Sequence, residues 1–261
     1  MTELAERAAR KLLEDRDQGI RFSSITQEFG IENLAAAYDV QDELVALLGA
    51  RQGASSGYKI GLTSKSMQEM CSIDQPICGT VFADGVNDTG QTIALSEKGR
   101  TGMEFEIAVR MGSDLGGPGQ TVQLDDVAQA VDGVAAAFEM IDDRNADYGS
   151  LEVLSLVADN SWSAGCVVGS FVTPPEDLAG VLGVVELNGE VVDQGHGREA
   201  LGHPYEPVRW LANHLAVRGG VLRKGDIVLT GSLVRTLFPS SGDRFRFDVA
   251  GIGTVEVEFA A

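Results

Sequence analysis

The stretch from Arg100 to Arg110, RTGMEFEIAVR, constrains this chain more than any other, because its alternation suits an extended strand. Every second residue from Met103 to Val109 is apolar, and Glu104 and Glu106 lie between them. Successive side chains of a strand point to opposite faces, so a strand here directs both carboxylates to one side. The two carboxylates on that side are either exposed to solvent or bound around a cation. The stretch by itself leaves both interpretations open.

A third acid, Glu139, favours the second interpretation. It lies in the predicted strand 131–141 as the one charged residue on a face of small and apolar side chains. A solvated face usually carries several polar residues. Three carboxylates that converge in a buried pocket need a compensating cation to remain ionised. Because oxygen-only ligands favour a hard ion, Glu104, Glu106 and Glu139 are candidate ligands of Mg²⁺ or Mn²⁺.

Lys59 is the candidate companion of these acids. It lies between Tyr58 and Ile60 on a predicted strand. Taken alone, such a lysine more often extends its ammonium group to solvent. Signatures of two other chemistries are missing, because the sequence has no phosphate loop and no dinucleotide-binding fingerprint. The three histidines fall in two loops and on one amphipathic helix, where we expect structural roles.

The net charge limits the partners of the chain. At a formal −19, and without a basic patch, it is not expected to bind nucleic acid or an anionic membrane. Its three cysteines imply no disulfide framework and suit a reducing compartment. The first residues lack a signal-peptide pattern, and no apolar run approaches the length of a membrane span. We therefore expect a cytoplasmic protein.

The spacing of apolar residues changes near residue 53, from a helical pattern to one typical of strands. Helical spacing predicts one helix to about Asp15 and another over 31–49, so residues 1–53 are predicted to form an N-terminal helical lobe. Residues 54–261 are predicted to form a mostly β catalytic domain with inserted helices, in which Asn188-Gly189 is the strongest hairpin signal. The predicted helices of this part are 124–130, 151–157 and 207–217, and its later strands are 164–168, 181–187, 190–194, 226–229, 244–249 and 254–259.

Seven short segments occur in the order seen in the 2-keto-4-pentenoate hydratases, and together they resemble that family. These enzymes belong to the fumarylacetoacetate hydrolase superfamily, which also includes the 4-oxalocrotonate decarboxylases. The resemblance runs from about Leu4 to Phe259. The segments are 57–64 (GYKIGLTS), 74–76 (DQP), 104–106 (EFE), 138–142 (FEMID), 157–160 (VADN), 201–204 (LGHP) and 229–232 (LTGS).

The resemblance implies an α+β fold, with the superfamily's mixed β-roll behind the helical lobe. It also implies that Lys59 is the active-site lysine and that the three glutamates bind the divalent ion. The substrate pocket would be lined by Asp159, Asn160, Ser161 and Ser232. Family members commonly form homo-oligomers and act in the degradation of aromatic rings after meta-cleavage.

The activity implied is hydration of a small 2-hydroxy-2,4-dienoate, of the 2-hydroxypenta-2,4-dienoate type, to a 4-hydroxy-2-oxo acid. Decarboxylation of 2-oxo-3-hexenedioate (4-oxalocrotonate) is the alternative, because Ile77 stands where many hydratases have an acid, whereas 163–169 (SAGCVVG) is closer to the hydratase form. Thr101-Gly102 also replaces a Pro-Arg pair that usually precedes the first metal glutamate. A C–C bond hydrolase is less favoured, since no histidine is placed to activate water near the metal. A non-catalytic partner subunit of the same fold is a further alternative, which the complete set of acids and lysine argues against.

Overall fold

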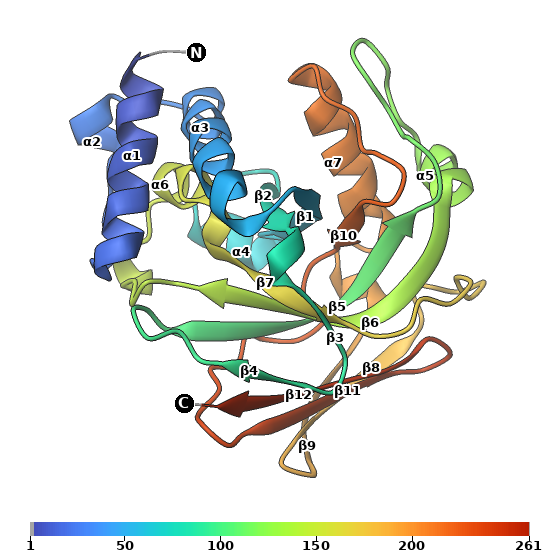
Figure 1. Cartoon of the computed structure of the whole chain (residues 1–261). Helices are drawn as coiled ribbons and strands as arrows, with labels where there is room; N and C mark the ends of the chain where they lie inside the picture. The colour runs from blue at the N-terminus through green and yellow to red at the C-terminus, as the bar shows by residue number, and fades with distance from the viewer. Residues whose placement is uncertain (1–2, 261) are drawn as a thin grey trace.

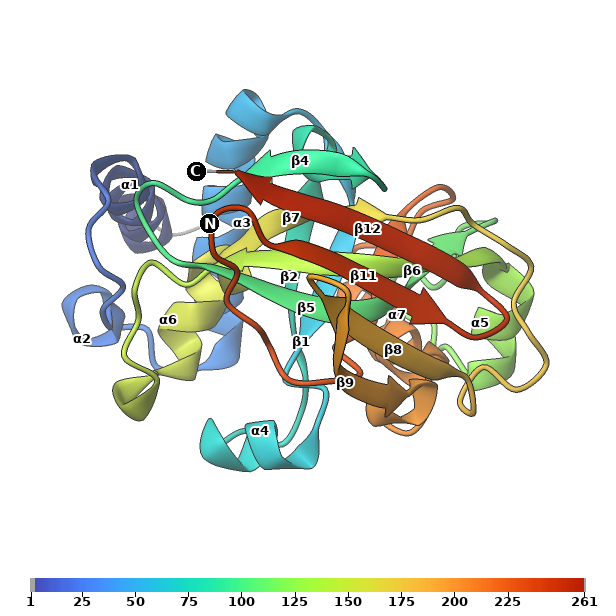
Figure 2. The same ribbon diagram turned by 90° about the horizontal axis from the view of Figure 1, so that it is seen from below.

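Two β-sheets pack face to face, and most of the helices cover the outer face of the larger sheet (Figure 1). The computed structural model describes residues 3–260. Figure 2, seen from below, shows the smaller sheet lying across the larger one. This combination of helices with two mixed sheets agrees with the predicted α+β class.

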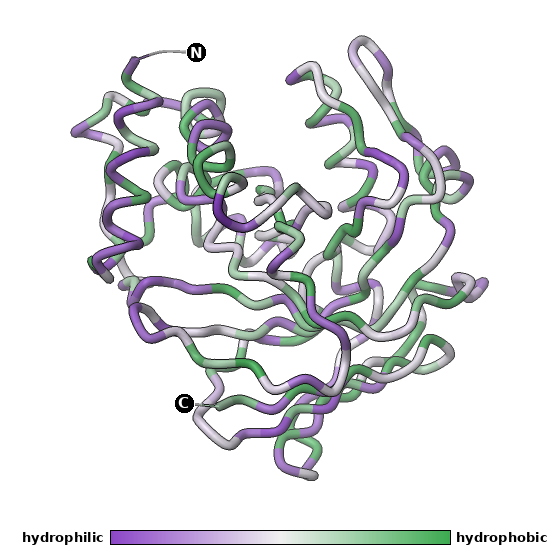
Figure 3. The backbone as a smooth tube through the Cα atoms, in the orientation of Figure 1, coloured by the Kyte–Doolittle hydropathy of each residue, from purple (hydrophilic) through white to green (hydrophobic). Residues whose placement is uncertain are grey.

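Three of the described α-helices come from the first part of the chain, and four are inserted between strands. α1 is amphipathic and buries Ala5, Ala8, Ala9 and Leu12, whereas its outward side is hydrophilic (Figure 3). The α-helices are α1 (Glu3–Gln18), α2 (Thr26–Phe29), α3 (Leu34–Gln52), α4 (Lys65–Met70), α5 (Leu124–Ala130), α6 (Val153–Ala158) and α7 (Tyr205–Val217). Single 3₁₀ turns are η1 (Ala83–Gly85), η2 (Tyr148–Ser150), η3 (Asn160–Trp162) and η4 (Gly197–Glu199).

The larger sheet has seven strands in the order β2-β1-β10-β5-β6-β7-β3, and the smaller has five in the order β4-β12-β11-β8-β9. The strands of the larger sheet are β1 (Ser55–Gly61), β2 (Ile77–Phe82), β3 (Val86–Asp88), β5 (Thr101–Met111), β6 (Val131–Asp142), β7 (Ser163–Val168) and β10 (Ile227–Leu229). Those of the smaller sheet are β4 (Gln91–Ala94), β8 (Leu182–Leu187), β9 (Glu190–His196), β11 (Arg244–Val249) and β12 (Gly253–Ala260).

The hydrophobic core lies between the two sheets and continues under the helices. A cluster of aromatic rings joins the sheets. The ring centroid of Phe105 on β5 lies 5.5 Å from that of Phe138 on β6 and 5.8 Å from that of Phe247 on β11. Phe105 and Phe138 are the apolar residues that alternate with the glutamates, so burying one face of β5 and β6 against β11 directs the acids to the other face.

Most of the predicted elements are present, with small shifts at their ends. The Asn188-Gly189 hairpin is confirmed, and both residues have the positive φ angles, 54° and 85°, that a tight hairpin turn requires. α1 extends three residues beyond the predicted Asp15. The short helix α2 and the strands β3 and β4 were not predicted, because segments of three or four residues carry too little periodicity.

The end of α3 at Gln52 and the start of β1 at Ser55 flank the predicted division at residue 53. The helices nevertheless share one hydrophobic cluster with the sheets, so the separation into a lobe and a catalytic domain stays a prediction. None of the described helices is long and apolar enough to cross a membrane.

Candidate metal centre and substrate pocket

The β5–β6 ladder brings the three predicted acids together. Glu104 is paired directly with Glu139 across the ladder, and Glu106 follows two residues along the same face of β5. One carboxylate oxygen from each lies within 4.8 Å of those of the other two. Like charges at directly opposed strand positions repel each other, so this arrangement is unfavourable without a cation.

Lys59 supplies one positive charge to this cluster. β1 carries it onto the same side of the sheet, and Lys59 Nζ lies 2.7 Å from Glu139 Oε1. The side chain is buried, with 6% of its surface exposed. Burial by itself lowers the pKa of Lys59, but the neighbouring Glu139, Glu104 and Glu106 outweigh it, so the pKa is raised and the ammonium form is favoured.

One lysine does not balance three acids. Burial raises the pKa of Glu106 well above its usual range, and Glu139 and Glu104 raise it further. Burial likewise raises the pKa of Glu139 to about 7, although Lys59 opposes this shift. Glu106 Oε1 and Glu139 Oε2 are buried and have no hydrogen-bond partner among the described residues. Buried oxygens of this kind are costly unless a ligand binds them.

The segment 230–237, which follows β10, orients two of the three acids. It runs beside β5, where the Gly231 N–H donates to Glu106 Oε2 at 2.7 Å and the Thr236 hydroxyl donates to Glu104 Oε1 at 2.7 Å. Gly231 adopts a φ of +105°, and a Cβ there would lie 2.2 Å from Thr63 Oγ1, so glycine is required at this point. Thr236 was not predicted as a site residue, because no sequence pattern links it to a strand more than 130 residues earlier.

The donor set fits a divalent ion. It consists only of carboxylate oxygens, two of them unpartnered, gathered within one ion's coordination sphere and beside a cavity that can admit water or substrate. Oxygen ligands and room for further ligands suit Mg²⁺ or Mn²⁺. Glu104, Glu106 and Glu139 could therefore hold such an ion, with Gly231 and Thr236 fixing two of the carboxylates.

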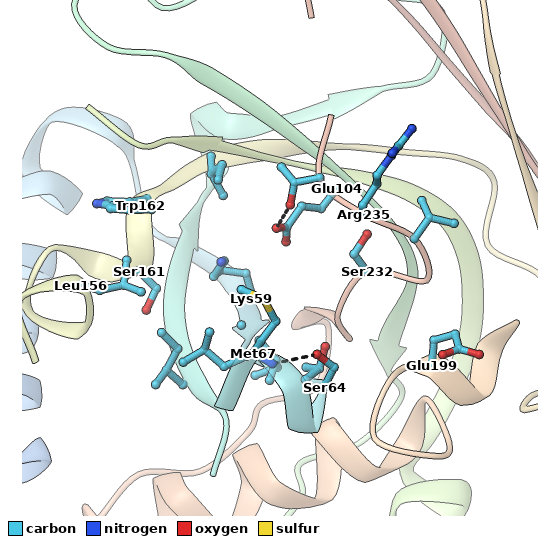
Figure 4. A pocket seen from close by; sticks show the side chains of 18 of the residues that line it. Lys59, Ser64, Met67, Glu104, Leu156, Ser161, Trp162, Glu199, Ser232 and Arg235 are labelled. Carbon is cyan, nitrogen blue, oxygen red and sulfur yellow. Dashed lines mark hydrogen bonds between the residues drawn. The ribbon is translucent and has the colours of Figure 1, made fainter. Parts of the chain in front are cut away.

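A cavity of about 400 Å³ opens from this cluster (Figure 4). Lys59, Glu104 and Ser232 line it, and Ser161 lies on the side opposite Ser232 and Glu104. The Ser232 hydroxyl accepts a hydrogen bond from the Phe105 N–H at 2.9 Å. The Ser161 hydroxyl donates to the Cys78 carbonyl at 2.9 Å. Both predicted substrate contacts thus border the cavity.

Asp159 and Asn160 have a different environment, because neither lines the cavity. Asp159 is fully buried and accepts from Arg16 Nε at 2.7 Å and from a terminal nitrogen of Arg144 at 2.8 Å. The Asn160 side chain accepts from the Thr80 N–H at 2.7 Å and donates to the Thr80 carbonyl at 3.0 Å. In the structure these two side chains tie the η3 turn to α1, to β2 and to Arg144, which lies two residues beyond the end of β6.

The η3 turn is strained, which explains why it needs these anchors. Asn160, Ser161 and Trp162 have φ angles of 51°, 48° and 58°, a left-handed run that costs energy for each non-glycine residue. The turn lies so close to β2 that a Cβ on Gly79 would be 2.5 Å from the Asn160 carbonyl oxygen. The anchors hold Ser161 at the cavity wall.

Comparison with known proteins gives a consistent result. The family model for the C-terminal part of fumarylacetoacetate hydrolase matches residues 53–260. The 2-hydroxyhexa-2,4-dienoate hydratase of Comamonas testosteroni is 34% identical over 85% of this chain and 85% of its own. The 2-keto-4-pentenoate hydratase of Paraburkholderia xenovorans LB400 is also 34% identical, over 97% of this chain and 94% of its own.

A solved structure agrees over nearly the whole length. The 4-oxalocrotonate decarboxylase of Pseudomonas putida G7, complexed with magnesium and adipate, superposes with a TM-score of 0.91 at 32% identity, covering 99% of this chain and 98% of its own. The helical segment before residue 53 therefore has a counterpart in that protein.

Proposed function

Because this chain belongs to the fumarylacetoacetate hydrolase family, we propose that it is a lyase that adds water to a 2-hydroxy-2,4-dienoate and yields a 4-hydroxy-2-oxo acid. The substrate would be of the 2-hydroxypenta-2,4-dienoate type, in the catabolism of aromatic compounds after meta-cleavage. The relatives named above as hydratases support this activity. The observation that carries it is the buried carboxylate cluster with one lysine at the end of a cavity.

We infer that Glu104, Glu106 and Glu139 hold Mg²⁺ or Mn²⁺. The magnesium in the decarboxylase complex supports a divalent ion at this kind of site. When bound, the ion supplies positive charge where the substrate's carboxylate and C2 oxygen gather negative charge. The three acids then need no protons to lower their mutual repulsion.

Lys59 is the residue placed to help with proton movement. The overall reaction has two parts: the enol proton leaves the C2 oxygen while C5 gains a proton, and then a water oxygen bonds to C4 while C3 gains a proton. A charged ammonium 2.7 Å from Glu139 favours the anionic enolate that precedes each carbon protonation. General acid–base help of this type contributes roughly 10²–10⁴-fold.

Ser161 and Ser232 are proposed to contact the substrate, since both border the cavity. Asp159 and Asn160, predicted with them, are proposed to act by holding Ser161 in place. We also propose that the protein assembles as a homo-oligomer and acts in the cytoplasm. Light scattering on the purified chain would test the assembly directly.

Decarboxylation of 4-oxalocrotonate is the second candidate function. Ile77, a fully apolar residue on the cavity wall, replaces an acid expected for hydration, and the superposed solved structure is of a decarboxylase. Loss of CO₂ from a 2-oxo-enedioate leaves the same enolate, so one set of residues serves both reactions.

The two functions are separated by supplying each substrate with Mg²⁺. 2-Hydroxypenta-2,4-dienoate should lose its dienol absorbance, with the Glu106→Gln variant inactive. 2-Oxo-3-hexenedioate should release little CO₂. Rapid CO₂ release from the diacid with no turnover of the dienoate would replace the hydratase proposal by the decarboxylase one.

A further inference from the structure

The cavity extends beyond the residues that would hold the reacting carbons, and much of its remaining wall is apolar. Its volume of about 400 Å³ lies within the range of sites that bury a small ligand, and it leaves room for atoms beyond C5 of a five-carbon acid. Six apolar side chains form much of this wall: Leu62, Met67, Ile77, Leu151, Leu156 and Trp162.

Charged side chains do not offer a second carboxylate a partner here. Besides Lys59 and Glu104, the cavity is lined by two charged residues, Glu199 and Arg235. The Arg235 side chain is 74% exposed, and its Nε lies 3.6 Å from Asp193 Oδ2. It points away from Lys59 and Met67 (Figure 4). Glu199 would repel a carboxylate. Along the described wall, therefore, Lys59 is the one cation directed inward, and it is paired with Glu139.

We propose that this chain selects dienoates with one carboxylate and an apolar substituent at C5, and rejects those that end in a second carboxylate. The inference rests on the function proposed above. An apolar tail would leave water and pack on the six side chains, gaining roughly fourfold in affinity per methylene. A carboxylate tail would lose its hydrating water without gaining a cation as a partner. This loss of affinity is larger than the gain from an apolar tail.

The test compares kcat/KM for four 2-hydroxy-2,4-dienoates that differ at C5, which carries hydrogen, methyl, propyl or a carboxylate. We expect the methyl and propyl compounds to equal or exceed the unsubstituted one, and the carboxylate to be about 100-fold poorer. The inference is overturned if the dicarboxylate matches or exceeds the propyl compound.

A variant and a binding measurement make the result specific. Met67 lies on α4, 38% exposed, so Met67→Lys should fold and place a cation at the apolar wall. It should raise the ratio of dicarboxylate to propyl turnover at least fivefold, whereas Met67→Leu should leave that ratio unchanged. Equal ratios in the two variants would argue against a tail site at Met67.

Calorimetry with Mg²⁺ separates this inference from the hydratase proposal. 2-Oxohexanoate and 2-oxoadipate share the metal-binding end and differ in the terminal carboxylate. Preference for 2-oxohexanoate with no turnover of any dienoate would keep the tail inference and reject the hydratase function. Preference for 2-oxoadipate alongside active hydration would reject the tail inference and keep the hydratase function.

Discussion

Glu104 and Glu139 face each other directly across the β5–β6 ladder, each on a strand whose other face is packed into the aromatic core. A ladder fixes the separation of opposed side chains to a few ångströms, so neither carboxylate can avoid the other without breaking backbone pairing. The fold thus holds the two acids in place before any ion binds. Lys59 relieves part of the repulsion by contacting Glu139.

Replacing Glu106 by Gln should abolish the effect of divalent ions on stability. The amide keeps the acceptor for the Gly231 N–H and removes a buried negative charge, so we expect the metal-free variant to melt at or above the wild-type temperature. Wild type at 100 times its Kd for Mg²⁺ should gain about 2.7 kcal/mol. Melting curves with and without Mg²⁺ or Mn²⁺ check this, and an unchanged wild-type curve would contradict a metal site.

Replacing Lys59 by Met should separate catalysis from metal binding. Loss of the ammonium group should reduce kcat by roughly 10²–10⁴-fold. Mg²⁺ affinity should hold or increase, because a competing positive charge is gone from beside Glu139. Calorimetry gives the affinity and the dienol absorbance gives the rate. Loss of both together would mean that Lys59 only supports the structure of the site.

Thr236 should prove to be a positioning residue for Glu104. Thr236→Val keeps the shape of the side chain and removes the hydroxyl that donates to Glu104 Oε1 at 2.7 Å. Loss of such an outer partner should weaken Mg²⁺ binding about 10- to 100-fold. Thr236→Ser retains the donor and serves as the control. Equal affinities in the two variants would show that the hydrogen bond does not orient Glu104.

Asp159 should matter for folding more than for substrate binding. Asp159→Asn leaves Arg144, itself 5% exposed, without its charged partner, and weakens the contact to Arg16. Breaking a buried ion pair costs about 3–5 kcal/mol. Urea unfolding should show this loss, while KM measured on the folded fraction stays within a few fold. A large rise in KM at near wild-type stability would contradict a mainly structural role for Asp159.

Stability should fall as the pH drops from about 6.5 to 4, in part because of His214. The centroid of this ring lies 5.1 Å from that of Trp210 and 4.4 Å from that of Tyr38. Burial, together with the nearby charge of Arg218, lowers the pKa of His214 to about 4. Between its unfolded pKa near 6.5 and the folded value of about 4, the unfolded chain binds more protons, so acid favours unfolding.

The His214 contribution is isolated by comparing wild type with His214→Gln. The difference in unfolding free energy between pH 7 and pH 4 should be smaller in the variant by roughly 1–3 kcal/mol, allowing for partial exposure of the ring. Urea titrations at each pH provide the values. Parallel pH profiles for the two proteins would exclude His214 as the cause.

The sequence alone identified the strand that carries Glu104 and Glu106, because strand periodicity is local and a buried partner face leaves a clear alternation. For the same reason it identified the strand of Glu139 and the Asn188-Gly189 hairpin. The ordered motifs then indicated the family. The strands and the hairpin depend on residues a few positions apart, which is the range over which periodicity is informative, whereas the family was indicated by the order of seven short motifs along the chain.

Only the tertiary structure decided how these parts meet. The register that sets Glu104 opposite Glu139, the distance from Lys59 to Glu139 and the donation from Thr236 to Glu104 all join residues far apart in the chain. Asp159 and Asn160 show the same limit. Their sequence motif suggested a substrate role, but the packing of α1 and β2 engages both side chains in buried hydrogen bonds. Such contacts follow from which elements pack together, and no local pattern records that.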